Sequence, residues 1–280
     1  MSRTPHVLLL GGHGKVSLLL TPKILARAWN LTSVIRNPAQ EPALVEAGKN
    51  GPGKINALVE SLEDVKSVSD AGRILDTVKP DWVVWSAGAG GHGGPDRTYA
   101  IDRDACIHFI RASVSRPSIT KFLLVSALSI RRNRAPWWDE DSYATVQKVN
   151  NEMMPHYYKA KLAADEALTI LGEERIRSQP EGPTSPNFGY IILRPGNLSD
   201  KEETDKISLG KTKARGAVSR GDVAEVAVRL LEKEGIKGWF DLLEGDEGVA
   251  SAVERVVKEG VDSIEGESLD AMREDLEKQI

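Results

Sequence analysis

The sequence predicts an α/β fold in which a mostly parallel β-sheet carries helices on both faces. Short apolar runs alternate with amphipathic stretches of helical length along almost the whole chain, and this alternation is typical of βαβ units. The apolar runs are rich in Val, Ile and Leu without a polar residue at every second position, which indicates strands buried on both faces. The predicted strands are His6–Leu10, Leu31–Ile35, Trp82–Ser86, Lys121–Ser126, Tyr190–Leu193 and Trp239–Leu243.

The amphipathic stretches between these strands predict five helices. Pro22 falls inside the first of them, where a proline removes a backbone donor and crowds the preceding turn. That helix therefore either kinks near Leu20–Thr21 or has a different register. The tail, Val249–Ile280, predicts a small C-terminal helical extension of two helices. The five helices are Lys15–Asn30, Asp64–Val78, Arg97–Ser115, Tyr157–Leu171 and Gly221–Glu234.

We expect one domain over residues 1–280, with two long loops on the substrate side at about residues 131–156 and 194–218. Trp137 and Trp138, in the first loop, would close over a substrate or pack in the core. Basic residues precede this tryptophan pair, which is a combination seen in nucleic-acid sites. The acidic residues that follow at once favour a substrate loop instead.

Composition sets the class of protein. Hydrophobic residues make up 40% and charged residues 28%, which is close to the globular average. The net charge is -4, from 37 basic and 41 acidic side chains, so the chain as a whole has no electrostatic attraction to nucleic acid or to an acidic membrane. No stretch reaches the ~20 apolar residues that cross a bilayer. We expect a cytoplasmic monomer or homodimer with a small-molecule substrate, no metal site, and Cys106 as a small buried hydrophobe.

A glycine turn between the first strand and the first helix is the strongest sign of a ligand. Gly11 can make the tight turn, and Gly14 lets a pyrophosphate approach the backbone, where the helix N-terminus supplies free N–H groups and a positive dipole end. This context predicts a doubly wound Rossmann fold, the alternative being a tight turn without a ligand. The expected cofactor-binding residues here are Gly11, Gly12, His13, Gly14, Lys15 and Val16.

The end of the second predicted strand favours one cofactor over another. Cofactors with a free ribose 2′-hydroxyl usually meet an Asp or Glu at this point, but the strand runs into Arg36. A guanidinium suits a 2′-phosphate, so NADP(H) is preferred and NAD(H) stays possible. The alternative is that Arg36 is a solvated charge at a strand end.

Small residues follow the Trp82–Ser86 strand. Ser86, Ala87 and Gly88 would let a ribose or a flat ring lie against the backbone. In an open α/β sheet, ligands bind outside the carboxyl ends of the strands. We therefore expect these three residues to contact the cofactor.

Together these motifs resemble the short-chain dehydrogenase/reductase superfamily, and in particular its atypical, NmrA-like branch of NAD(P)-binding proteins with biliverdin- and flavin-reductase-like members. The resemblance spans about residues 7–243 and rests on the glycine turn, Arg36, Ser86-Ala87-Gly88-Ala89, Leu124-Val125-Ser126, Tyr157-Tyr158-Lys159-Ala160-Lys161, Leu193-Arg194-Pro195-Gly196 and Ser219-Arg220-Gly221-Asp222-Val223-Ala224. The chain departs from the family pattern at Ser17, in place of a third glycine, and at Ser61, where many members have Asp.

The resemblance implies specific roles. Tyr157 would exchange a proton with a carbonyl or alcohol, Lys161 would bind the nicotinamide ribose and lower the tyrosine pKa, and Ser126 would polarise the substrate oxygen. Pro195 and Gly196 would pass near the nicotinamide. Tyr158 and Ser129 compete for the tyrosine and serine roles because they lie so close in sequence.

The sequence thus predicts an NADPH-dependent oxidoreductase that acts on a small carbonyl or aromatic redox substrate. The alternative is a non-catalytic NADP(H)-sensing regulator of the NmrA type. Epimerase chemistry with a retained cofactor is a third possibility, with no dedicated residue to support it.

Overall fold

The computed structural model describes residues 4–91, 93–179 and 187–278, whose centre is a nine-stranded sheet. Its order is β11-β8-β10-β6-β5-β4-β1-β2-β3. The strands β3, β2, β1, β4, β5, β6 and β10 pair in parallel, and β8 pairs antiparallel with both β10 and β11. The chain changes winding direction between β1 and β4, so the doubly wound fold is confirmed. The bounds are β1 (His6–Leu10), β2 (Asn30–Ile35), β3 (Ile55–Val59), β4 (Trp82–Trp85), β5 (Lys121–Val125), β6 (Gly189–Pro195), β8 (Lys206–Gly210), β10 (Lys237–Glu244) and β11 (Glu247–Gly248).

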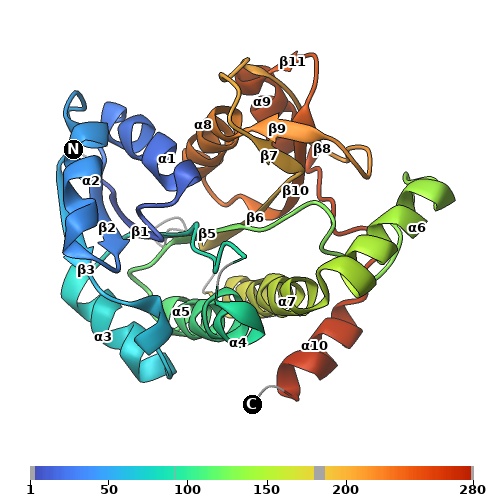
Figure 1. Cartoon of the computed structure of the whole chain (residues 1–280), viewed down its shortest axis with the longest axis horizontal. Helices are drawn as coiled ribbons and strands as arrows, with labels where there is room; N and C mark the ends of the chain where they lie inside the picture. The colour runs from blue at the N-terminus through green and yellow to red at the C-terminus, as the bar shows by residue number, and fades with distance from the viewer. Residues whose placement is uncertain (1–3, 92, 180–186, 279–280) are drawn as a thin grey trace.

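Helices cover both faces of the sheet (Figure 1). On one face lie α1 (Lys15–Ala26), α8 (Arg220–Leu231) and α9 (Val249–Glu259). On the other lie α3 (Val68–Val78), α5 (Cys106–Val114), α7 (Pro155–Arg177) and α10 (Leu269–Glu277). A short helix, α4 (Gly94–Thr98), runs through a π-helical turn at Tyr99–Ala105 into α5, and α2 (Glu41–Gly48) precedes β3.

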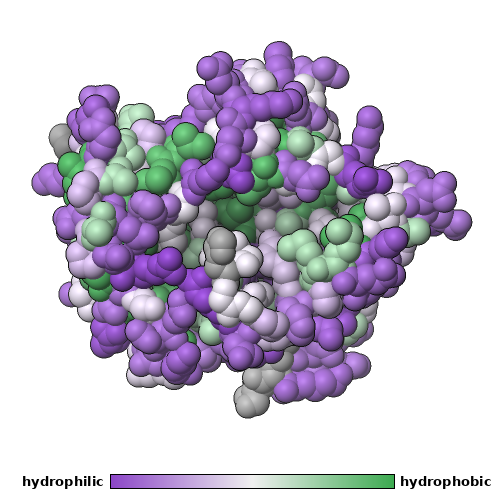
Figure 2. Space-filling view, in the orientation of Figure 1, coloured by the Kyte–Doolittle hydropathy of each residue, from purple (hydrophilic) through white to green (hydrophobic). Residues whose placement is uncertain are grey.

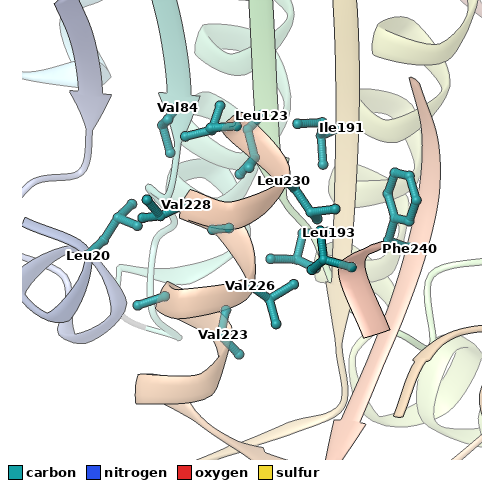
Figure 3. Packing of buried hydrophobic residues seen from close by; sticks show 14 of the residues in the cluster. Leu20, Val84, Leu123, Ile191, Leu193, Val223, Val226, Val228, Leu230 and Phe240 are labelled. Atoms are coloured by element: carbon teal, nitrogen blue, oxygen red, sulfur yellow. The ribbon is translucent and has the colours of Figure 1, made fainter. Parts of the chain in front are cut away.

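Alternate strand residues feed the two hydrophobic layers. Val7 and Leu9 of β1 belong to the cluster under α1 and α8, and Leu8 and Leu10 to the cluster under α5 and α7. Figure 3 shows the first cluster, in which Leu230 of α8 lies among side chains of the central strands. Full burial of such a side chain is worth roughly 1.5–3 kcal/mol, so both layers hold the strand ends in place.

The C-terminal extension is helical, as predicted, and its two helices pack on opposite faces of the sheet. The apolar side of α9 joins the cluster that contains α8, and Met272 and Leu276 of α10 join the cluster that contains α7. Cys106 is fully buried, as predicted.

Several elements differ from the prediction. The first helix ends at Ala26 and continues through Pro22, where the Thr21 hydroxyl donates to the Ser17 carbonyl. The edge strand β3 was not predicted. The expected loop at 131–156 contains α6 (Glu140–Lys148), whose N-cap Asp139 accepts from the Ser142 amide. The expected loop at 194–218 contains β8 and the parallel pair β7 (Asn197–Ser199) and β9 (Ala217–Ser219).

In the parts of the chain that the structure describes, no helix is both long enough and apolar enough to span a membrane.

Candidate functional site

The glycine turn has the geometry that a bound pyrophosphate needs. Gly11 has φ +85°, and a Cβ there would lie 2.6 Å from the Cα of Ala87, so only glycine fits. Gly12 is buried, with its amide on the Val34 carbonyl, and Gly14 is the N-cap of α1 without a capping side chain. The first amides of α1 are therefore left to a ligand at the positive end of the helix. These residues fit a dinucleotide phosphate.

A cavity of about 320 Å³ opens beside this turn at the carboxyl ends of β1, β2 and β4. It brings together most of the predicted cofactor residues. The Ser86–Gly88 segment forms one wall, and Arg36 lies at the end of β2. The lining residues named in the prediction are Gly11, His13, Gly14, Arg36, Ser86, Ala87 and Gly88.

Arg36 is the exposed cation of this cavity. Its guanidinium makes no ion pair with any residue that the structure describes. The two carboxylates that also line the cavity are engaged elsewhere, because Glu60 pairs with Arg73 at 2.9 Å and Glu63 with Arg97 at 2.8 Å. Arg36 is thus available to a ligand phosphate.

The side chains of two residues predicted to bind the phosphates do not line this cavity. Lys15 does not line the cavity, and its ammonium pairs with Asp200 at 2.6 Å, which also pairs with Arg220 at 2.6 Å. Lys15 therefore ties the start of α1 to the chain before α8. Val16 is buried in the core and offers its backbone amide only.

Tyr157 and Lys161 lie one helical turn apart on α7. Lys161 is buried, and its ammonium donates to the Val125 carbonyl at 2.9 Å, at the end of β5. Burial lowers the pKa of Lys161, but Tyr157, Asp102 and Asp165 together hold it above its ordinary value. Burial raises the pKa of the Tyr157 hydroxyl, with Lys161 opposing the rise. The helix thus sets a half-buried tyrosine beside a buried cation.

The competing tyrosine is occupied by the protein itself. The Tyr158 hydroxyl donates to the Arg131 carbonyl at 3.1 Å. Burial raises the pKa of Tyr158 to about 12, and Arg132 opposes the rise. The Tyr157 hydroxyl makes no hydrogen bond to a residue that the structure describes, and Tyr157 is the tyrosine in electrostatic contact with Lys161.

Ser126 is also tied to the protein. Its buried hydroxyl donates to an Asp165 carboxylate oxygen at 2.6 Å. Asp165 in turn lies 3.4 Å from the Arg194 guanidinium, which donates to Asp241 at 2.7 Å. Ser126 therefore belongs to a fully buried ionic network behind Tyr157 and Lys161.

Sequence reasoning missed Asp102, which joins the two halves of the site. This buried carboxylate accepts from the Ala89 amide at 2.9 Å and so fixes the segment after β4. Burial raises the pKa of Asp102, and Lys161 opposes the rise. The sequence carries little signal of this, because Asp102 begins the charged triplet Asp102-Arg103-Asp104 and nothing local shows that this one of the three is buried.

Pro195 and Gly196 lie in a second cavity, of about 210 Å³. This cavity opens at the end of β6 and is also lined by the segment Ala127–Ser129 after β5. In the sheet, β5 lies between β4, which ends at the first cavity, and β6, which ends at the second. The Lys161 ammonium is bound to the end of β5, and neither Lys161 nor Tyr157 lines either cavity. Figure 2 shows this face of the molecule hollowed near its middle, with hydrophobic side chains inside a hydrophilic rim.

Comparison with known proteins identifies the family. The model of an NAD(P)H-binding family matches residues 11–234. An UPF0659 protein of Schizosaccharomyces pombe is 28% identical over 258 residues, which cover 90% of this chain and 95% of the relative. A Bacillus subtilis protein named an uncharacterized sugar epimerase is 28% identical over 253 residues, 89% of this chain and 99% of the relative.

A solved structure of a putative NAD-dependent epimerase/dehydratase from Bacillus halodurans has a TM-score of 0.67 and 28% identity, covering 90% of this chain and 99% of that one. The resemblance to atypical short-chain dehydrogenases is therefore confirmed. The family match begins at the glycine turn and runs past both cavities, and the chain belongs to the NAD(P)H-binding family.

Proposed function

We propose that this protein is an NADPH-dependent oxidoreductase that reduces a small carbonyl-bearing or redox-active aromatic molecule. The observation that carries the proposal is the Tyr157–Lys161 pair, which is held at the end of β5, the strand between the two strands that end at the cavities. A dinucleotide seated on the glycine turn and along the strand ends would bring its nicotinamide toward this pair.

When bound, the nicotinamide supplies the hydride, and the chain's residues handle the proton. Tyr157 donates its hydroxyl proton to the substrate oxygen. Its raised pKa keeps it protonated at neutral pH, which suits a donor. Lys161, whose raised pKa keeps it charged, stabilises the tyrosinate that remains. The same ammonium can bind the nicotinamide ribose.

Ser126 acts in this proposal as a positioning residue. Its hydroxyl proton is engaged by Asp165, so it is not free to bond a substrate oxygen. Asp165 lies one helical turn beyond Lys161, and the bond from Ser126 ties that turn of α7 to the end of β5. Ser126 and Asp165 thereby keep Lys161 on the Val125 carbonyl.

The test compares two adjacent tyrosines. NADPH oxidation is followed against a panel of carbonyl and quinone compounds. We expect Tyr157→Phe to lower kcat by about 10²- to 10⁴-fold, because a positioned proton donor contributes that much, with NADPH affinity unchanged. Tyr158→Phe is the matched control, and it should keep kcat within a few-fold. Equal turnover in wild type and Tyr157→Phe would rule out the tyrosine mechanism.

The runner-up function is a non-catalytic NADP(H)-sensing regulator, and the buried hydroxyl of Ser126 favours it. A regulator would bind NADPH and turn over nothing on the panel. The relatives' names raise epimerisation as a further possibility. An epimerase returns the hydride to its substrate, so it would interconvert isomers without net consumption of NADPH.

A further inference from the structure

The second cavity has an apolar interior. Leu128, Val146 and Ala214 line it and are buried in a small hydrophobic cluster with Trp138 and Leu243, separate from the two layers of the main core. Val149 and Pro195 add to the same lining. An apolar ring or chain of a small molecule would lose water on entering this space without leaving a polar group unpaired.

The polar lining of this cavity carries a single charged residue. None of its lining residues is acidic, and Arg215 is the cation among them. The Arg215 side chain is exposed and makes no ion pair or hydrogen bond with the residues that the structure describes. Asn197 and Ser129 also line the cavity, and their side chains make no hydrogen bond to a residue that the structure describes. The rim therefore offers donors to an anion.

The loop that carries Arg215 is held in place. The Thr212 carbonyl accepts from the indole Nε1 of Trp137 at 2.8 Å and of Trp138 at 2.9 Å. At the other end, the Asn197 amide donates to the Gly216 carbonyl at 2.9 Å. The two tryptophans thus position the loop over the cavity, and a guanidinium on an anchored loop loses less conformational freedom on binding.

We propose that the second cavity selects a small carbonyl compound whose apolar body ends in a carboxylate, and that Arg215 binds this carboxylate. A guanidinium matches a carboxylate through two parallel N–H···O bonds, and a single cation balances its single charge. The proposal rests on the reductase function above and names its substrate class. Arg215 is then a specificity-determining residue, away from the proton transfer at Tyr157.

The experiment measures binding, so it does not depend on turnover. Benzoylformate and its neutral methyl ester share the ring and the carbonyl and differ in the carboxylate. Each is titrated into the full-length protein by calorimetry, with and without NADP⁺. We expect the wild type to bind benzoylformate more tightly, and Arg215→Gln to weaken it about 10- to 100-fold, as expected for a lost charge-assisted bond. The affinity for the methyl ester should be the same in wild type and in Arg215→Gln.

The control is Lys213→Gln, which removes an exposed cation of the same loop that does not line the cavity. It should leave benzoylformate affinity within about twofold, and Arg215→Lys should recover only part of the loss. If Lys213→Gln and Arg215→Gln weakened benzoylformate binding equally, the overall charge of the loop would explain the effect, and the proposal would be overturned. So would equal affinity of the acid and the ester. Turnover of the ester without this discrimination would leave the reductase function standing while removing Arg215 from it.

Discussion

At the scale of a single residue, we propose that Arg36 decides which cofactor the first cavity takes. Its guanidinium is exposed at the end of β2 and has no carboxylate partner among the described residues. A 2′-phosphate would gain charge-assisted hydrogen bonds from it, and a free 2′-hydroxyl would not.

We expect Arg36→Ala to weaken NADPH binding about 10- to 100-fold and to change NADH binding by less than about threefold. Fluorescence titration of both nucleotides measures this. The control is Arg273→Ala, because Arg273 pairs with Asp270 at 3.1 Å and neither residue lines the cavity. If wild type already binds the two nucleotides equally, Arg36 is only a solvated strand-end charge.

Residue types and spacings singled out the glycine turn and Arg36, and the family resemblance singled out the Tyr157–Lys161 pair, because each depends on neighbours in sequence. Their roles in binding and catalysis stay predictions. The bond between Ser126 and Asp165 joins residues 39 positions apart, so no local pattern could reveal it. Tyr157 and Tyr158 were indistinguishable in sequence. Neighbouring residues on a helix point about 100° apart. Tyr157 therefore lies beside the Lys161 ammonium, and the Tyr158 hydroxyl donates to the Arg131 carbonyl.

At the scale of elements, α7 is the helix that organises the site. Tyr157, Lys161 and Asp165 are spaced four residues apart and so share one side of it. Burial raises the pKa of Asp165 to about 6, and Arg194 and Lys161 oppose the rise. Its ordinary value is 3.8. The folded protein therefore holds this proton more tightly than the unfolded chain does, and ionisation of Asp165 destabilises the fold as pH rises from about 4 to 6.

Asp165→Asn removes this pH dependence. The free energy of unfolding of the variant, relative to wild type, should rise by on the order of 3 kcal/mol between pH 4 and pH 7. Most of the change should fall below pH 6. Urea denaturation of both proteins across this range measures the difference. A difference that stays flat with pH would show that Asp165 titrates at the same pH in the folded and unfolded states.

The elements that sequence reasoning missed are those with weak patterns. The edge strand β3 has no fully buried residue, so its sequence lacks the continuous apolar run of the central strands. In α6, a single residue, Val146, is buried, and its polar surface made the segment look like a loop. The central strands and the amphipathic helices were predictable because burial on both faces, or on one face, leaves a regular pattern of apolar residues in the sequence.

At the scale of the whole molecule, cofactor binding and folding are linked. A ligand that binds only the folded state stabilises it by about 2.7 kcal/mol at a hundred times its Kd. We expect NADPH to raise the free energy of unfolding of wild type by this amount. Gly14→Ala should abolish most of the gain, because a methyl group would stand where the pyrophosphate meets the backbone.

Gly248→Ala is the matched control for this change. Gly14 and Gly248 are both helix N-caps without a capping bond, with φ −64° and −61°. Neither needs glycine for its own backbone, so both variants should lose about 1 kcal/mol or less without ligand. NADPH should then stabilise Gly248→Ala as it does wild type. Equal ligand effects in the two variants would place the phosphates elsewhere.

The two cavities share no lining residue, and they divide the chain in order. Every residue of the first lies between Gly11 and Ile101, and every residue of the second between Ala127 and Gly216. Under the proposed reductase function, an inherited change among the lining residues of the second cavity can therefore alter the choice of substrate without changing a residue that lines the first cavity. Descendants of one ancestral gene could diversify in their second segment while keeping the first, and an engineer could exchange the segments between relatives on the same principle.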